Sequence, residues 1–244
     1  MKTTLVINPK GGSGKTTIAI NLAACFAADN VPTTLMDYDP QASSLTWLRS
    51  RAANAPTIYP ANGAPEKYGR LRSFEMYVPP HTRQLVIDAP AGASGLLLQE
   101  LVSRADCIII PVAPSAIDIH ATANFIRDLL LSGRMRVRNA RLAVVANRVR
   151  SSMPVYQPLE RFLGSLNLPL LARLADSDIF LKAAETGAGL FEMDSLQCSG
   201  EREQFMPIVA WVDQSAKTEA DKKVVEITRS VPRPAISSVL PRRL

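Results

Sequence analysis

Residues 10–17, Lys-Gly-Gly-Ser-Gly-Lys-Thr-Thr, combine three glycines with two lysines and two threonines. The run follows the apolar segment Thr3–Asn8 and opens a stretch of helical spacing. Because glycine lacks a Cβ atom, such a loop can fold closely around an anion with its N–H groups pointing inward. The N-terminus of the following helix adds partial positive charge. The segment therefore predicts a P-loop, a cradle for the phosphates of a nucleotide.

The residues of this loop have separate expected contacts. The backbone around Gly11, Gly12, Ser13 and Gly14 is expected to surround the phosphates. We expect Lys15 to reach the β- and γ-phosphates, the Thr16 hydroxyl to ligate Mg²⁺, and Thr17 to contact the α-phosphate. A chance glycine-rich turn is the alternative. The strand before, the helix after and Gly-Lys-Thr at their junction favour the P-loop.

The loop departs from the usual pattern at its start, where Pro9 replaces the first glycine and a second lysine, Lys10, follows. This K-G-G-x-G-K-T-T pattern resembles the deviant Walker A box of the ParA/MinD family of ATPases. The resemblance implies that Lys10 reaches across a dimer interface to the partner's nucleotide. Such a lysine would be a cation supplied in trans, present on the phosphate only in an ATP-bound homodimer.

Two acidic segments follow in the order that the family has them. Leu35–Gln41 is similar to the family's D-x-D-P-Q segment, which implies that Asp39 orients or activates the attacking water and that Asp37 supports the metal region. Leu85–Gly92 resembles Walker B with its following switch, which implies that Asp88 holds Mg²⁺ through water. For each aspartate alone, capping of the next helix is the alternative.

Three later segments also look like parts of this family. Ala113–Asp118 is one, and Val145–Val149 is another, in which Asn147 is the family-type adenine contact. This second segment lacks the N-K-x-D pattern of guanine selection, which favours ATP over GTP. Ala183–Gly187 matches a later family helix, with simple packing as the alternative. The resemblance covers roughly residues 1–213.

Short β-branched apolar runs alternate with longer stretches of helical spacing. The expected strands are Thr3–Asn8, Thr33–Asp37, Gln84–Asp88, Cys107–Val112, Arg141–Asn147 and Leu168–Leu174. The expected helices are Lys15–Ala28, Ser43–Ala53, Gly95–Ser103, Ile117–Leu131 and Val155–Leu166. Near-continuous apolar strands are typical of a parallel sheet with helices on both faces. We therefore expect a doubly wound, mostly parallel α/β fold that binds ligands beyond the carboxyl ends of its strands.

Composition predicts one domain and a basic tail. The chain has 244 residues, of which 47% are apolar and 20% charged, with a formal net charge of +6; this suits one sizeable core. We divide it into an ATPase domain over residues 1–213 and a basic tail over 214–244, partly helical or disordered. Three scattered cysteines fit a reducing cytoplasm. No apolar run approaches the about 18 residues of a membrane span, so we expect no integral membrane association.

Several functions are compatible with the resemblance. An iron-protein reductase would need cluster-ligating cysteines, of which no suitable pair is visible. A MinD-like membrane switch would need a C-terminal amphipathic helix, which Pro232, Pro234 and Pro241 would break. The favoured alternative is a ParA-like positioning ATPase, whose ATP dimer binds nucleoid DNA non-specifically and whose cargo-bound adaptor protein stimulates hydrolysis. An ATP-dependent amidoligase of the cobyrinate diamide synthase or dethiobiotin synthetase kind is the enzymatic alternative.

Arginines after the fourth and fifth expected strands supply the candidate DNA contacts. They are Arg134, Arg136, Arg138, Arg148, Arg150 and Arg161, with Arg141 in the same cluster along the chain. Several arginines on one face would neutralise phosphates and make binding sensitive to salt, although a solvated basic surface is the alternative. The Asp-Ala-Pro-Ala-Gly, Pro-Ser-Ala-Ile-Asp and Ala-Asn-Arg-Val-Arg segments together resemble the carboxysome-positioning McdA group. Plasmids and chemoreceptor clusters are alternative cargoes.

Overall fold

A seven-stranded parallel sheet forms the centre of the protein. The structure, a computed structural model, describes residues 1–64, 76–131, 140–150, 157–165 and 167–214. The strands are β1 (Lys2–Val6), β2 (Thr33–Asp37), β3 (Ile58–Asn62), β4 (Gln84–Asp88), β5 (Cys107–Val112), β6 (Arg141–Val149) and β7 (Leu170–Ala175). Their order across the sheet is β3-β2-β4-β1-β5-β6-β7, and all the pairs are parallel. The predicted fold class is confirmed.

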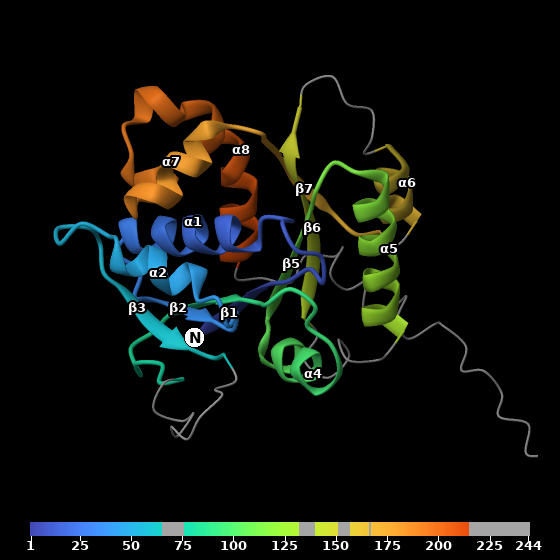
Figure 1. Ribbon diagram of the computed structural model, residues 1–244, viewed down its shortest axis with the longest axis horizontal. Helices are drawn as coiled ribbons and strands as arrows, with labels where there is room; N and C mark the ends of the chain where they lie inside the picture. Colours follow the sequence, from blue (N-terminus) through green and yellow to red (C-terminus); the bar gives the residue numbers. More distant parts are fainter. Residues whose placement is uncertain (65–75, 132–139, 151–156, 166, 215–244) are drawn as a thin grey trace, which may run out of the picture.

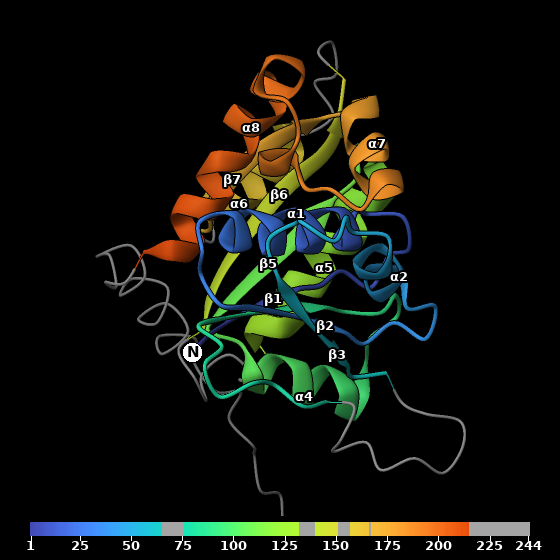
Figure 2. The same cartoon turned by 90° about the vertical axis from the view of Figure 1, so that its left-hand side faces the viewer.

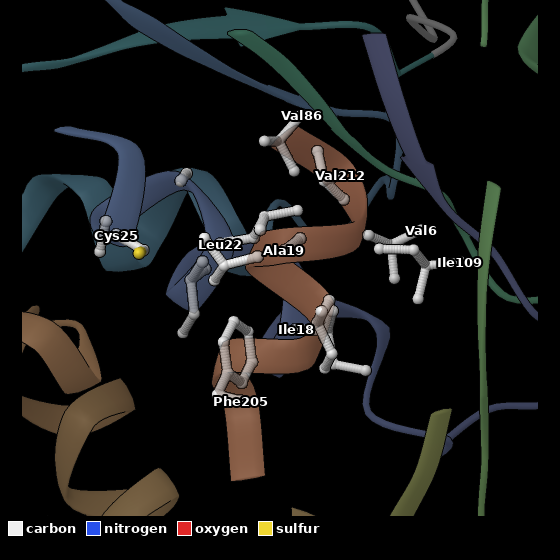
Figure 3. Close-up of a cluster of buried hydrophobic side chains, with 14 of the residues drawn as sticks. Val6, Ile18, Ala19, Leu22, Cys25, Val86, Ile109, Phe205 and Val212 are labelled. Atoms are coloured by element: carbon white, nitrogen blue, oxygen red, sulfur yellow. The ribbon is translucent and has the colours of Figure 1, made fainter. Parts of the chain in front are cut away.

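Helices cover both faces of the sheet (Figures 1 and 2). They are α1 (Lys15–Ala28), α2 (Ser43–Arg49), α4 (Gly95–Arg104), α5 (Ala116–Leu131), α6 (Gln157–Ser165), α7 (Asp178–Thr186) and α8 (Ser195–Asp213), with a short 3-10 helix, η3, at Leu190–Glu192. One buried core joins α4, α5 and α6 to the sheet, and a second joins α1, α2, α7 and α8 to the other face. Figure 3 shows Phe205 of α8 near Ile18 of α1, and Val212 of α8 near Val86 of β4, in this second core.

The sequence prediction missed or misplaced several elements. Strand β3 was missed because Pro60 interrupts its apolar pattern; the strand lies at the edge of the sheet, where a proline is tolerated. Helix α2 ends at Arg49, four residues before the predicted end. Helix α8 was missed because it contains Gly200 and Pro207 and changes direction at Cys198, whose φ is −132°. The predicted basic tail, apart from Gln214, lies outside the described residues.

The C-terminal end of α8 is held at the amino ends of the strands. The Lys2 ammonium, at the start of β1, donates to the carbonyl oxygens of Val212 and Gln214. Arg141, at the start of β6, donates to the Trp211 carbonyl at 2.6 Å and lies over the Trp211 ring at 4.4 Å. The last described residue, Gln214, therefore lies at the sheet edge opposite to the carboxyl ends of the strands.

A buried ion pair joins the end of α2 to η3. Arg51 and Glu192 have side chains only 7% and 10% exposed, and their closest atoms are 2.6 Å apart. Arg51 also donates to the carbonyls of Gly187 and Pro56, and Glu192 accepts the N–H of Gly189. The ion pair and these hydrogen bonds thus join the two segments in one buried polar network.

Replacing Arg51 with alanine is expected to lower the free energy of unfolding by about 3–5 kcal/mol, because it leaves the Glu192 carboxylate buried without its counter-ion. Urea unfolding monitored by circular dichroism measures this change. Arg49→Ala is the matched control: Arg49 is exposed on α2, and we expect a change within about 0.5 kcal/mol. Equal losses for the two variants would contradict the prediction.

Candidate nucleotide-binding site

The P-loop connects β1 to α1 at the carboxyl end of the central strand. Gly12 and Gly14 have φ angles of 73° and 94°, in the left-handed region that glycine tolerates best. A Cβ atom on Gly14 would lie 1.9 Å from Nδ2 of Asn147, so this position also requires glycine for space. The same Asn147 amide donates to the Ser13 carbonyl at 3.0 Å. The predicted loop therefore packs against the end of β6.

Lys15 brings positive charge to the inside of this loop. Its side chain is buried, and its ammonium donates to the Lys10 carbonyl at 3.0 Å. Burial lowers the pKa of Lys15, and the carboxylates of Asp88 and Asp39 oppose this change. Asp88 and Asp39 are therefore both within electrostatic reach of Lys15, and their predicted roles, Mg²⁺ binding for Asp88 and water activation for Asp39, stay predictions.

Asp88 ends β4 and offers a cation two buried oxygens. Burial, reinforced by repulsion from Asp37, raises the pKa of Asp88 to about 7, and the Thr16 hydroxyl and the Lys15 ammonium oppose that rise. Within the described residues, neither carboxylate oxygen of Asp88 accepts a well-formed hydrogen bond. The Thr16 hydroxyl lies beside the Asp88 carboxylate, whose oxygens can accept further ligands. This donor set suits Mg²⁺, which prefers oxygen ligands. Thr16 and Asp88 therefore fit the ion that the sequence resemblance implies.

Asp37 has a visible structural role at the end of β2. Its Oδ2 accepts hydrogen bonds from the Ser44 N–H and hydroxyl and from the Leu45 N–H, at 2.7–3.2 Å. These contacts satisfy the N-terminus of α2. Its Oδ1 accepts the Asp39 N–H at 2.8 Å. Support of the metal region by Asp37 stays a prediction, while its support of the Asp39 loop is seen directly.

Asp39 lies in a tight turn between β2 and α2. Its Oδ1 accepts the Gln41 N–H at 2.9 Å, and its carbonyl accepts the Ala42 N–H at 2.8 Å. Ala42 has a φ of 51°, an unfavourable value for a residue with a Cβ atom. Asp39 itself is partly exposed. The turn therefore presents a carboxylate that water can reach beside Lys15.

Lys10 projects from the first part of the loop toward α5. Its ammonium lies 3.7 Å from Asp118, and the two side chains are 43% and 25% exposed. Asn8, which sequence analysis did not single out, accepts the Lys10 N–H and donates to the Pro111 carbonyl and the Thr122 hydroxyl. A polar residue at the end of a buried strand was the available signal for Asn8. Its bonds fix the backbone of Lys10 to β5 and α5.

Asn147 and Arg148 lie at an irregularity in the sheet. The β6–β7 register shifts between Ala146 and Val149, and Arg148 has a φ of 54°. Such irregularities commonly re-aim a side chain near a functional site. Here Asn147 meets the P-loop, and its predicted adenine contact stays a prediction.

The candidate DNA-binding arginines have different surroundings. Arg148 and Arg161 are exposed, and Arg150 is exposed but pairs with Asp176 at 3.0 Å. Arg134, Arg136 and Arg138 lie outside the described residues. Arg141 does not belong with this group, because it binds the end of α8 and the Cys107 sulfur. Its place at the first residue of β6 is the physical reason for this correction.

Two further observations bear on the alternatives. All three cysteines are buried, so none is placed as an exposed ligand of an iron–sulfur cluster. None of the helices described in the structure has the length and apolar character needed to cross a membrane.

Comparison with known proteins gives consistent matches. A family model described as the CobQ/CobB/MinD/ParA nucleotide binding domain matches residues 4–190. Maintenance of carboxysome distribution protein A of Halothiobacillus neapolitanus is 26% identical over 196 residues, which cover 78% of this chain and 87% of that protein.

Solved structures resemble the fold. The cell division protein MinD of Aquifex aeolicus has a TM-score of 0.66 at 16% identity, over 89% of this chain and 99% of that one. An ATP complex of McdA from Cyanothece has a TM-score of 0.63 at 16% identity, with the same coverage of 89% and 99%.

Proposed function

This chain belongs to the CobQ/CobB/MinD/ParA family of nucleotide-binding domains, and we propose that it is a ParA-like ATPase that positions or segregates a cellular cargo. The observation that carries the proposal is the P-loop with its buried Lys15 at the end of β1, next to the end of β4, where Asp88 stands opposite Val6. The relative from H. neapolitanus is named for carboxysome distribution, so a carboxysome is the cargo that we favour. Plasmids and other protein clusters are the alternative cargoes.

The residues of the site divide the work of hydrolysis. The N–H groups of residues 11–15 bind the phosphates of ATP, and Lys15 balances the charge of the β- and γ-phosphates. Asp39 holds a water molecule in line with the γ-phosphate. When bound, Mg²⁺ supplies charge neutralisation at the phosphate oxygens, with Thr16 and, through water, Asp88 as its protein ligands.

Lys10 completes the site of a second copy of the chain. Its present partner, Asp118, lies 3.7 Å away in a pair that solvent reaches, and such pairs contribute only about 0–1 kcal/mol. Lys10 can therefore leave Asp118 at little cost and turn to the phosphates of a partner protomer. In this proposal the dimer forms with ATP, and an adaptor protein on the cargo stimulates hydrolysis and so separates the protomers.

In this proposal the ATP dimer binds DNA of the nucleoid without sequence preference. Because the nucleoid lies in the cytoplasm, the protein would act there. Arg148 and Arg161 support this part of the proposal; Arg150 is exposed as well but pairs with Asp176. Phosphate contacts of this kind release counter-ions, which makes the affinity fall steeply with salt.

Binding to random-sequence duplex DNA across a salt series tests the proposal. We expect binding with ATP but not with ADP, and a loss of affinity of about 10³-fold between 50 and 200 mM salt if the dimer makes about six phosphate contacts. Fluorescence anisotropy of labelled DNA measures both. No binding in either nucleotide state would refute the DNA-based mechanism, and an ATPase rate raised by small carboxylic acids instead of DNA would favour an amidoligase.

A matched pair of variants separates specific contacts from net charge. Replacing Arg148 and Arg161 with glutamate should weaken DNA binding and flatten its salt dependence. Replacing the exposed Arg49 and Arg83 with glutamate changes the net charge equally at other places in the fold. If both double variants lose affinity equally, these two arginines are not the DNA contacts.

A further inference from the structure

Adjacent residues at the end of β2 hold helices on opposite faces of the sheet. Asp37 binds the first turn of α2 through Ser44 and Leu45. Tyr38 points to the other face, where its ring belongs to the core that contains α4. Asp39 comes next in the chain. The backbone that carries Asp39 is therefore fixed from both sides of the sheet.

Tyr38 is fully buried, with 0% of its surface exposed. Its hydroxyl donates to Oε1 of Glu100 at 3.0 Å and accepts a hydrogen bond from the Arg104 guanidinium. Glu100 and Arg104 lie one turn apart on α4 and pair with each other at 3.5 Å. The side chains of Tyr38, Glu100 and Arg104 thus form a polar cluster in which each contacts the other two.

The backbone and the ring of Tyr38 also have close contacts. Its N–H donates to the Asp88 carbonyl at 3.0 Å. A Cβ atom on Gly63 would lie 2.5 Å from the ring, so the backbone of Gly63 packs directly against it. The backbone after β3 therefore limits the tilt of the ring, and the N–H hydrogen bond joins the backbone of Tyr38 to the end of β4. Tyr38 is therefore a rigid connection between Asp39, Asp88 and α4.

We propose that Tyr38 is a positioning residue that ties the Asp39 loop to α4, so that the rate of hydrolysis depends on where α4 lies. Helix α4 follows the segment after Asp88, in which the Gly92 N–H donates to the Pro9 carbonyl at the start of the P-loop. A displacement of α4 would therefore move both the loop that carries Asp39 and the segment that borders the phosphates. The inference rests on the proposed role of Asp39 in hydrolysis.

The partners of the Tyr38 hydroxyl on α4 are accessible from the surface, which would let another protein act on this connection. The side chains of Glu100 and Arg104 are 36% and 35% exposed, so a protein that contacts α4 can reach them. The buried hydroxyl of Tyr38 would transmit such a contact to Asp39.

Replacing Tyr38 with phenylalanine removes only the hydroxyl. We expect kcat for Mg-ATP hydrolysis to fall about threefold to tenfold, as the loss of one or two hydrogen bonds implies, while KM and the affinity for a fluorescent ATP analogue stay unchanged. The double variant Glu100→Gln/Arg104→Gln leaves the core intact and should lower kcat by a similar factor. Adding Tyr38→Phe to it should bring no further loss, because the three side chains form one unit.

Tyr59→Phe, on the neighbouring strand β3, is the matched control and should leave kcat unchanged. A Tyr38→Phe protein with lower thermal stability but the wild-type kcat would overturn the inference, because it would show a structural role alone. An equal fall of kcat in Tyr59→Phe would overturn it as well. A wild-type chain that hydrolyses no ATP would refute the proposed function itself, which distinguishes the two failures.

Discussion

Replacing Asp39 with alanine is expected to leave ATP bound while lowering its hydrolysis about 10²- to 10⁴-fold, the contribution of a positioned general base. The carboxylate is partly exposed in a turn, where it accepts the N–H of Gln41. It contributes little to the core, so the loss should fall on the chemical step. Steady-state phosphate release, measured beside the affinity for a fluorescent ATP analogue, separates binding from hydrolysis.

The same variant tests the link between hydrolysis and assembly. If hydrolysis separates the protomers, Asp39→Ala should accumulate as a dimer with ATP, which light scattering after size exclusion would detect. Asp29→Ala removes an exposed carboxylate at the end of α1 and is the control. A variant that stays monomeric with ATP, or that hydrolyses ATP at the wild-type rate, would show that Asp39 has been assigned the wrong role.

Replacing Lys15 with alanine is expected to weaken ATP binding by about 10²- to 10³-fold, as the loss of a buried charge from an ionic contact does. Lys15 is buried near the carboxylates of Asp39 and Asp88. Without its ammonium, the triphosphate would approach two acidic groups with less opposing charge. Isothermal titration with ATP and Mg²⁺ measures the change.

Lys182→Ala is the control for Lys15, because Lys182 is exposed on α7, away from the P-loop. Both variants should fold, which circular dichroism checks. An affinity for ATP within threefold of wild type in a folded Lys15→Ala protein would contradict the P-loop assignment.

Much of the site was predictable because its signals are local. The glycines that bend the loop and Lys15 stand together in the chain, and Asp39 and Asp88 each follow a continuous apolar run. In a parallel sheet the ends of such runs meet at one edge, so proximity follows from topology. The structure brings Lys15, Asp39 and Asp88 together in this way.

Other features could not be predicted because they depend on which segments become neighbours. Nothing in the sequence near Tyr38 indicates that α4, more than fifty residues later, supplies the partners of its hydroxyl. Asn8 likewise meets Thr122 only once α5 has packed on the sheet. Helix α8 forms in spite of Gly200 and Pro207 because its apolar face packs on α1 and β7; tertiary packing overrides local propensity there.

The end of α8 and the P-loop lie at opposite ends of the strands. Lys2 and Arg141 hold the end of this helix at the amino ends of the strands, whereas the P-loop lies at the carboxyl end of β1. Gln214 therefore lies on the side away from the P-loop, and so away from the surface of the proposed dimer. A dye or a bead coupled at position 214 would therefore leave the nucleotide-binding surface open, which suits single-molecule measurements of assembly.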